Sequence, residues 1–570
     1  MCGIAGIFEY SHSKKVSLNE LTKINDYMQA RGPDGSGIWI NQDGFLGLAH
    51  RRLSIIDLSE NANQPMHEGD LSITFNGEIY NYKKLRDALI EKGCHFKTTS
   101  DTEVLLKLYQ LHGVAMLSHL RGMFAFAIWD EKNKILFCAR DHFGIKPFYY
   151  SDNGKSFYFA SQVKALLQSS TIDTSPCAAG QVGFYLLGSV PEPYTMYEGI
   201  QSLPAGHYFV VHTNGQRESK AYYSVKSAFI DAEQNPLSDF SLTENLYDTV
   251  KHHLVADVDV GVFLSAGIDS ATLVSVASEL NHKKLHTITL GFEEYKNTQK
   301  DETVLAFMIA KLFQTEHKNS WITELLAKEH FQKIMDAMDQ PSIDGINTYF
   351  VSLIAKQAGL KVALSGLGAD EIFAGYPLFS RIPKMLRYLK PLSFLPGLPV
   401  SFRKMTYKKL NKKQASLIEY SCDMPRAYFL SRAIYFPWEL NQFLEPDVIK
   451  KGLAQLNLLE RFKSDIEGIQ SKQFQISALE MQWYMRNQLL RDSDWASMAN
   501  SLEIRVPFVD VDFFENCVGA MATQSVTKKI LARAPHRSLP DSVINRKKTG
   551  FNIPIKKWYG TEYIAQKRGR

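Results

Sequence analysis

The second residue of the chain, Cys2, carries the group best suited to nucleophilic chemistry. Removal of Met1 would leave a thiol and a free α-amino group on one residue. Such an amine, with an ordinary pKa near about 8, can act as the base for its own thiol. The apolar run from Ile4 to Phe8 predicts a buried strand that would fix the thiol at its end. By itself, however, a second-position cysteine is more often an ordinary strand residue.

Polar clusters further along the first half could complete an amide-hydrolysing site. The side-chain amide of Asn76 and the backbone N–H of Gly77 could stabilise an oxyanion. Arg52 could bind a substrate carboxylate through two hydrogen bonds. Asp101 and Glu78 could hold an α-ammonium group. Glutamine, an amino acid with a side-chain amide, fits this set.

The second half contains the pattern of a strand, a turn of small residues and a helix twice. Residues 259–264 form an apolar run that leads into Ser265-Ala266-Gly267-Ile268-Asp269-Ser270. Residues 360–364 lead into Ser365-Gly366-Leu367-Gly368-Ala369-Asp370-Glu371, and 285–292 predict a further strand. Such turns direct backbone N–H groups and a helix dipole at an anion, and a carboxylate such as Asp269 can bind Mg²⁺. The pattern predicts a doubly wound sheet with a ligand at its carboxyl edge.

Length and composition limit the class of protein. A chain of 570 residues is too long for one core, so two or more domains are expected. The net charge of +5 without a dominant basic stripe argues against a nucleic-acid partner, and no apolar run reaches the ~18–20 residues of a membrane span. No secretory signal is evident. Six cysteines without metal-ligand spacing indicate reduced thiols in a cytoplasm; they are residues 2, 94, 138, 177, 422 and 517.

The motifs of the first half resemble the N-terminal-nucleophile glutaminase domain of the asparagine synthetase family. They are Cys2-Gly3-Ile4, Arg31-Gly32-Pro33-Asp34, Arg52-Leu53-Ser54-Ile55, Asn76-Gly77-Glu78-Ile79-Tyr80-Asn81, Ser100-Asp101-Thr102-Glu103 and Ala139-Arg140-Asp141-His142-Phe143-Gly144. The resemblance implies a sandwich of two antiparallel sheets between helices, which releases ammonia from glutamine through a thioester on Cys2. It also implies Asn76 and Gly77 as the oxyanion hole. The implied glutamine site comprises Arg52, Leu53, Ile55, Asn76, Gly77, Glu78 and Asp101.

The second half resembles the PP-loop ATP pyrophosphatase fold of the synthetase domain in the same family. The resemblance implies that a carboxylate attacks the α-phosphorus of ATP, and that ammonia then displaces AMP from the acyl-adenylate. It implies Mg²⁺ on Asp269 and Asp370, and a catalytic Lys548 near the adenylate. Ala266 stands where the family signature has a glycine. The implied ATP site comprises Leu264, Ser265, Ala266, Gly267, Asp269, Ser270, Leu290, Ser365 and Gly366.

These patterns predict a two-domain α/β protein. Residues 1–210 are expected to form the αββα glutaminase sandwich, and residues 241–570 the synthetase domain, a doubly wound parallel sheet with added helices. Residues 211–240, which are polar and irregular in pattern, are expected to be a linker. The expected partners are small molecules, namely glutamine, ATP and an acceptor acid, and a homodimer is compatible with the resemblance.

The acceptor is the least constrained part of this prediction. Aspartate, converted to asparagine, is the first candidate. Two features depart from the best-known aspartate-site pattern: Leu367 occupies a position that is glutamate there, and the segment Gln340-Pro341-Ser342-Ile343-Asp344-Gly345-Ile346-Asn347-Thr348 replaces another stretch. The same chemistry on a sugar uronic acid is therefore a rival. Intramolecular closure, as in β-lactam synthetases, is disfavoured because those relatives typically lose the cysteine. A non-catalytic protein is disfavoured because Cys2, Asn76, Asp101, Asp269 and Asp370 are all present.

Overall fold

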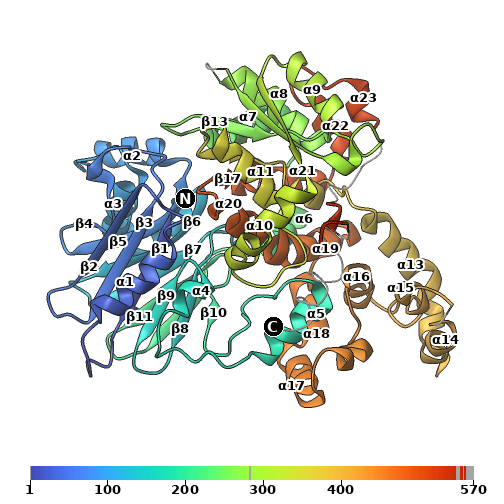
Figure 1. The fold of residues 1–570 in the computed structure, drawn as a ribbon, viewed down its shortest axis with the longest axis horizontal. Coiled ribbons are helices and arrows are strands. Elements are labelled where there is room, and N and C mark those ends of the chain that lie inside the picture. Colours follow the sequence, from blue (N-terminus) through green and yellow to red (C-terminus); the bar gives the residue numbers. More distant parts are fainter. Residues whose placement is uncertain (1, 282–283, 408, 547–552, 556, 560–570) are drawn as a thin grey trace.

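The computed structural model describes residues 2–281, 284–407, 409–546, 553–555 and 557–559. Figure 1 shows two parts side by side, an N-terminal part built on two antiparallel sheets and a C-terminal part built on a parallel sheet surrounded by helices. This confirms the predicted two-domain α/β fold. Within the described ranges, no helix is long and apolar enough to cross a membrane.

In the described part of the chain, each antiparallel sheet has six strands. The first contains, in order, β10 (Gln201–Ser202), β8 (Tyr149–Asp152), β9 (Phe157–Ala160), β1 (Gly3–Phe8), β3 (Leu46–Arg52) and β2 (Gly35–Ile40). The second contains β12 (Arg217–Ala221), β11 (His207–His212), β7 (Ile135–Arg140), β6 (Gly122–Asp130), β5 (Leu71–Ile79) and β4 (Met66–Glu68). The helices of this part are α1 (Leu18–Tyr27), α2 (Tyr82–Glu91), α3 (Asp101–His112) and α4 (Val163–Leu166), with the 3₁₀ turns η1 (Glu60–Ala62) and η2 (Gly113–His119). The next helix, α5 (Ala178–Leu187), packs against α17 (Pro446–Leu456) of the C-terminal part.

Strand β1 is buried on both faces, because one face packs against the second sheet and the other against helices. Ile4 and Phe8 pack between the sheets with Leu48 and Trp129. The alternate residue Ile7 packs outward with residues of α1 and α4. The period of two along the apolar run is therefore that of a strand with an apolar cover on each side. Helix α3 packs on β5 of the other sheet, which completes the αββα layers.

Among the residues that the structure describes, the C-terminal sheet has five strands, all parallel. Their order is β15 (Glu316–Ile322), β14 (His286–Phe292), β13 (Val260–Phe263), β16 (Val362–Leu364) and β17 (Glu503–Arg505). The chain proceeds from β13 to β14 and β15 on one side, then returns to β16 on the other side of β13. The gap between the carboxyl ends of β13 and β16 is thus the topological switch point, where ligands bind in open parallel sheets.

Helices surround this sheet and extend from it. They are α6 (Val225–Gln234), α7 (Leu242–His253), α8 (Ile268–Leu280), α9 (Thr303–Leu312), α10 (Glu324–Ala337), α11 (Ile346–Gln357), α12 (Ala369–Ile372), α13 (Leu378–Ser393), α14 (Leu398–Thr406), α15 (Lys412–Ala415), α16 (Met424–Arg432), α17 (Pro446–Leu456), α18 (Leu458–Ile466), α19 (Lys472–Leu479), the π-helix η5 (Glu480–Leu490), α20 (Arg491–Met498), α21 (Val511–Met521), α22 (Lys528–Arg533) and α23 (Asp541–Ile544), with 3₁₀ turns η3 (Glu293–Tyr295), η4 (Pro437–Gln442) and η6 (Pro507–Val509).

The expectation that residues 211–240 are irregular is wrong, because part of this stretch forms regular structure. The stretch contains strand β12, which pairs with β11 at the edge of the second sheet, and helix α6, which packs against α21. Strand β12 is polar because its residues are largely exposed at a sheet edge. A polar sequence of that kind cannot be distinguished from a linker by its pattern alone.

Candidate active sites

Cys2 is buried at the amino end of β1, directly beside Asn76 of β5. The backbone nitrogen of Cys2 donates to Oδ1 of Asn76 at 3.0 Å. That bond orients the amide, and its buried Nδ2 has no hydrogen-bond partner among the described residues. A buried donor without a partner carries a desolvation cost that an oxyanion could relieve. Burial also raises the pKa of the Cys2 thiol, so a nearby base is needed to generate the thiolate.

Gly77 follows Asn76 in the same strand and tolerates no side chain. A Cβ at this position would lie 2.1 Å from the carbonyl oxygen of Met123 on the neighbouring strand. The close approach of β5 and β6 therefore requires glycine here.

Two buried carboxylates, Glu78 and Asp101, lie in the same region. Asp101 opens helix α3 and accepts a hydrogen bond from the backbone nitrogen of Ile79 at 3.1 Å. Burial raises the pKa of Asp101 to about 7. Burial and the nearby Glu503 raise the pKa of Glu78 well above its ordinary value, although Arg505 Nη2 lies 3.4 Å from Glu78 Oε2. An ammonium group bound here would lower both pKa values.

Arg52 is the last residue of β3, the strand that pairs with β1, and its guanidinium is already engaged. It donates to the carbonyl of Ser59 at 2.7 Å, to Asn63 Oδ1 at 3.0 Å and to the carbonyl of Asp57. In this structure Arg52 therefore holds the 57–63 loop. Its two predicted neighbours, Leu53 and Ile55, are buried.

A cavity of about 320 Å³ occupies the switch point of the parallel sheet. It collects most of the residues predicted for ATP and metal: Leu264, Ser265, Asp269, Ser270, Leu290, Ser365, Gly366 and Asp370. The turn after β13 is tightened by hydrogen bonds from the Ser265 nitrogen to Ser270 Oγ at 3.1 Å and from the Gly267 nitrogen to Ser265 Oγ at 3.2 Å. Ala266 is fully buried and does not have a positive φ, so its methyl causes no backbone strain.

Lys528 was not predicted, and it lies between the two expected metal ligands. Its Nζ is 2.6 Å from Asp269 Oδ2 and also contacts Asp370. Burial alone would lower the pKa of Lys528, but these two carboxylates raise it above its ordinary value. In sequence Lys528 is one lysine of a basic pair at the start of α22, which is indistinguishable from a solvated surface charge. The lysine that the sequence did predict, Lys548, lies outside the described residues.

Buried polar residues connect the two sites. Arg31 donates through Nε to the carbonyl of Cys2 at 3.1 Å and through both terminal nitrogens to Asp494 of α20, at 2.7 and 3.0 Å. Arg505, at the end of β17, contacts Glu503 and approaches Glu78. Strand β17 pairs with β16, whose carboxyl end opens onto the cavity. Sequence motifs contained these residues but gave no sign that they meet.

Two family models match successive parts of the chain. A family model for a glutamine amidotransferase domain matches residues 1–223, and one for asparagine synthase matches residues 241–568. Asparagine synthetase [glutamine-hydrolyzing] 1 of Bacillus subtilis is 35% identical, with 99% of this chain and 88% of that protein covered. Asparagine synthetase [glutamine-hydrolyzing] 3 of the same organism is 31% identical over the same shares. A solved glutamine phosphoribosylpyrophosphate amidotransferase from B. subtilis covers 64% of this chain and 81% of its own, at 15% identity and a TM-score of 0.30.

Proposed function

We propose, for a chain that belongs to the glutamine-hydrolysing asparagine synthetase family, that Cys2 releases ammonia from glutamine and that the cavity at β13 and β16 fixes it on a carboxylate. ATP-dependent amidation with glutamine as nitrogen donor is the activity of this family, and the chain is a ligase of that kind. The residue assignments and the acceptor constitute the proposal.

In the first half, the thiolate of Cys2 attacks the amide carbon of glutamine. The α-amine of the same residue takes the thiol proton and passes it to the departing ammonia. Asn76 Nδ2 and the Gly77 N–H stabilise the oxyanion, while Glu78 and Asp101 hold the α-ammonium. Water then hydrolyses the thioester to release glutamate. The observation that best supports this scheme is the buried Asn76 Nδ2 beside Cys2, which has no hydrogen-bond partner in the described part of the chain.

In the second half, an oxygen of the acceptor carboxylate attacks the α-phosphorus of ATP and pyrophosphate leaves. Ammonia then attacks the acyl carbon and AMP leaves. The Ser265–Ser270 turn surrounds the phosphates with backbone and hydroxyl groups, and the Lys528 ammonium neutralises charge that develops there.

Asp269 and Asp370 fit a magnesium ion that comes with ATP. Mg²⁺ is commonly held by one or two carboxylates together with substrate phosphates, and these two carboxylates are close enough to share Lys528. When bound, the ion would neutralise charge on the phosphates. Among the described residues, no group of three or more His, Cys, Asp or Glu side chains could hold a metal ion without ligands from the ATP phosphates.

The test uses Cys2→Ala with glutamine or ammonium as nitrogen source and AMP formation as the readout. Glutamine-dependent turnover should disappear while ammonium-dependent turnover persists. Undiminished turnover with glutamine would reject Cys2 as the nucleophile.

Aspartate is the acceptor that the relatives' names suggest, but one observation favours a second candidate. Leu367 lines the ATP cavity at the position where the sequence departs from the aspartate pattern. The isobutyl side chain of Leu367 can neither accept a proton nor form an ion pair with an ammonium group of the substrate. A different carboxylate, such as a sugar uronic acid, is therefore the second candidate acceptor.

A further inference from the structure

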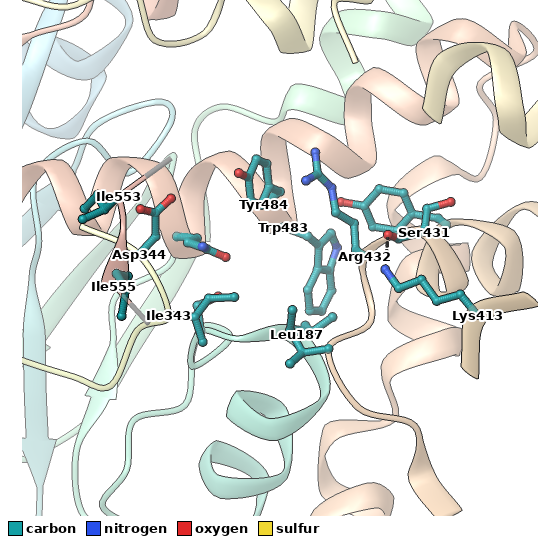
Figure 2. A pocket seen from close by; sticks show the side chains of 14 residues that line it. Leu187, Ile343, Asp344, Lys413, Ser431, Arg432, Trp483, Tyr484, Ile553 and Ile555 are labelled. Carbon is teal, nitrogen blue, oxygen red and sulfur yellow. Dashed lines mark hydrogen bonds between the residues drawn. The ribbon is translucent and has the colours of Figure 1, made fainter. Parts of the chain in front are cut away.

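A second cavity, of about 430 Å³, is lined by the residues drawn in Figure 2. It lies beside the ATP cavity. The two share a wall: Tyr484 lines the second cavity, Tyr376 lines the first, and their rings meet edge to face at 6.0 Å. Neighbouring residues of η5, Gln488 and Leu489, line the second and the first cavity respectively. A molecule in the second cavity would therefore lie next to ATP.

The walls of this cavity suit a ring-bearing polar molecule. Figure 2 shows Asp344 on one side and Lys413 on the other, with the Trp483 ring between them and Leu187 below. Aromatic faces offer large apolar contact, and a few polar groups set the orientation, as is usual in small-molecule sites. Sites for drug-sized ligands have volumes of about 300–1,000 Å³. A cavity of this size is large for aspartate alone.

Lys413 lies opposite Asp344 in the cavity lining and adds a positive charge to that wall. It is half-buried, and its Nζ donates to the backbone carbonyl of Ser431 at 2.7 Å. Among the described residues, no carboxylate lies within salt-bridge distance of it. Burial, then Arg432 and Lys412, lower the pKa of Lys413 to about 8.

The other cations nearby already have partners. Arg432 binds Glu480 through two nitrogens, with Nε 2.8 Å from Oε1, and stacks over the Tyr484 ring at 3.5 Å. Lys412 pairs with Glu439 at 3.4 Å and is not part of the cavity lining. Among the described residues that line the cavity, Lys413 is thus the cation without a carboxylate partner.

We infer that this cavity binds the acceptor, and that the acceptor is a carboxylic acid on a sugar-sized polar ring with a second anionic group, such as a phosphate, bound by Lys413. The inference rests on the proposed function and names its substrate class. The ring packs on Trp483, and its hydroxyls hydrogen-bond to polar groups such as Asp344. The reacting carboxylate lies at the Tyr484 end of the cavity, the end that adjoins the ATP cavity, and reaches the α-phosphorus of ATP there. There its oxygen displaces pyrophosphate, and ammonia later displaces AMP.

The experiment measures AMP formation with ammonium and ATP for three acids: glucuronic acid 1-phosphate, glucuronic acid and aspartate. We expect the phosphorylated sugar acid to give the lowest KM. Lys413→Met should raise that KM at least tenfold, because a charge-assisted hydrogen bond to phosphate is lost. It should change the KM for unphosphorylated glucuronic acid less than threefold. Lys413→Arg, which keeps the charge, should recover most of the affinity.

Lys412→Met is the matched control, since it removes the neighbouring cation outside the cavity and should leave every KM within twofold. Lys413 also bonds a carbonyl at the end of α16, so a purely structural role would change the KM of all three acids alike, and that outcome would overturn the inference. A lowest KM for aspartate, unaffected by Lys413→Met, would overturn it as well while leaving the proposed function intact. AMP formation with none of the acids would count against both.

Discussion

Replacing Asp494 with asparagine removes one partner of a buried ion pair that joins the two halves of the chain. The Arg31 and Asp494 side chains are only 2% and 9% exposed, and two hydrogen bonds connect them. Removal of one member of such a pair leaves a buried charge uncompensated, which costs about 3–5 kcal/mol. The free energy of unfolding should fall by that amount in urea denaturation of the whole chain.

The matched control is Asp34→Asn, which breaks a second contact between the halves. Asp34 lies 2.7 Å from Lys361, but these side chains are 28% and 36% exposed. Exposed pairs contribute about 0–1 kcal/mol, so the control should lose little stability. Arg31 also holds the carbonyl of Cys2, and Asp494→Asn should therefore lower the kcat/KM for glutamine and raise the ratio of glutamate to AMP above one. Equal losses in the two variants would refute the reasoning.

Two further predictions concern single groups in each site. Lys528→Met should slow pyrophosphate release about 100-fold, because a fixed positive charge at the phosphates is lost. The control Lys529→Met, on the exposed side of α22, should have no effect. Equal rates in both variants would exclude a role of Lys528 at the phosphates. The kcat/KM for glutamine should fall as pH drops below about 7, because Asp101 must be ionised to bind an ammonium and its pKa is raised to about 7. A glutaminase pH profile of Asp101→Asn should lack that fall, and an unchanged profile would contradict the assignment.

The sequence predicted those elements whose environment matches their composition. The strands β13, β14 and β16 were predicted because central parallel strands are apolar on both faces. Strand β15 was missed because it lies at the edge, where polar residues such as Lys318 and Asn319 face solvent. Strand β17 was missed because it has three residues, and its two charged members, Glu503 and Arg505, are buried as a mutual pair.

The same limit of prediction from sequence applies to the two candidate active sites. Ser265 and Ser270, the first and last residues of one six-residue turn motif, were recognised because such a local motif carries their geometry. Lys528 and the Arg31–Asp494 pair were not, because tertiary folding brings them together from positions far apart in the chain. The engagement of Arg52 by the 57–63 loop was equally unreadable, since no motif specifies which acceptors a guanidinium will find.

In the proposed function, one polypeptide frees nitrogen in its first half and fixes it in its second. The most direct test supplies glutamine labelled with ¹⁵N in its amide, an excess of unlabelled ammonium, and the acid that supports AMP formation. If ammonia passes internally from Cys2 to the ATP cavity, the product amide will be richer in ¹⁵N than the ammonium in solution. A product with the same isotope ratio as the solution would contradict the account.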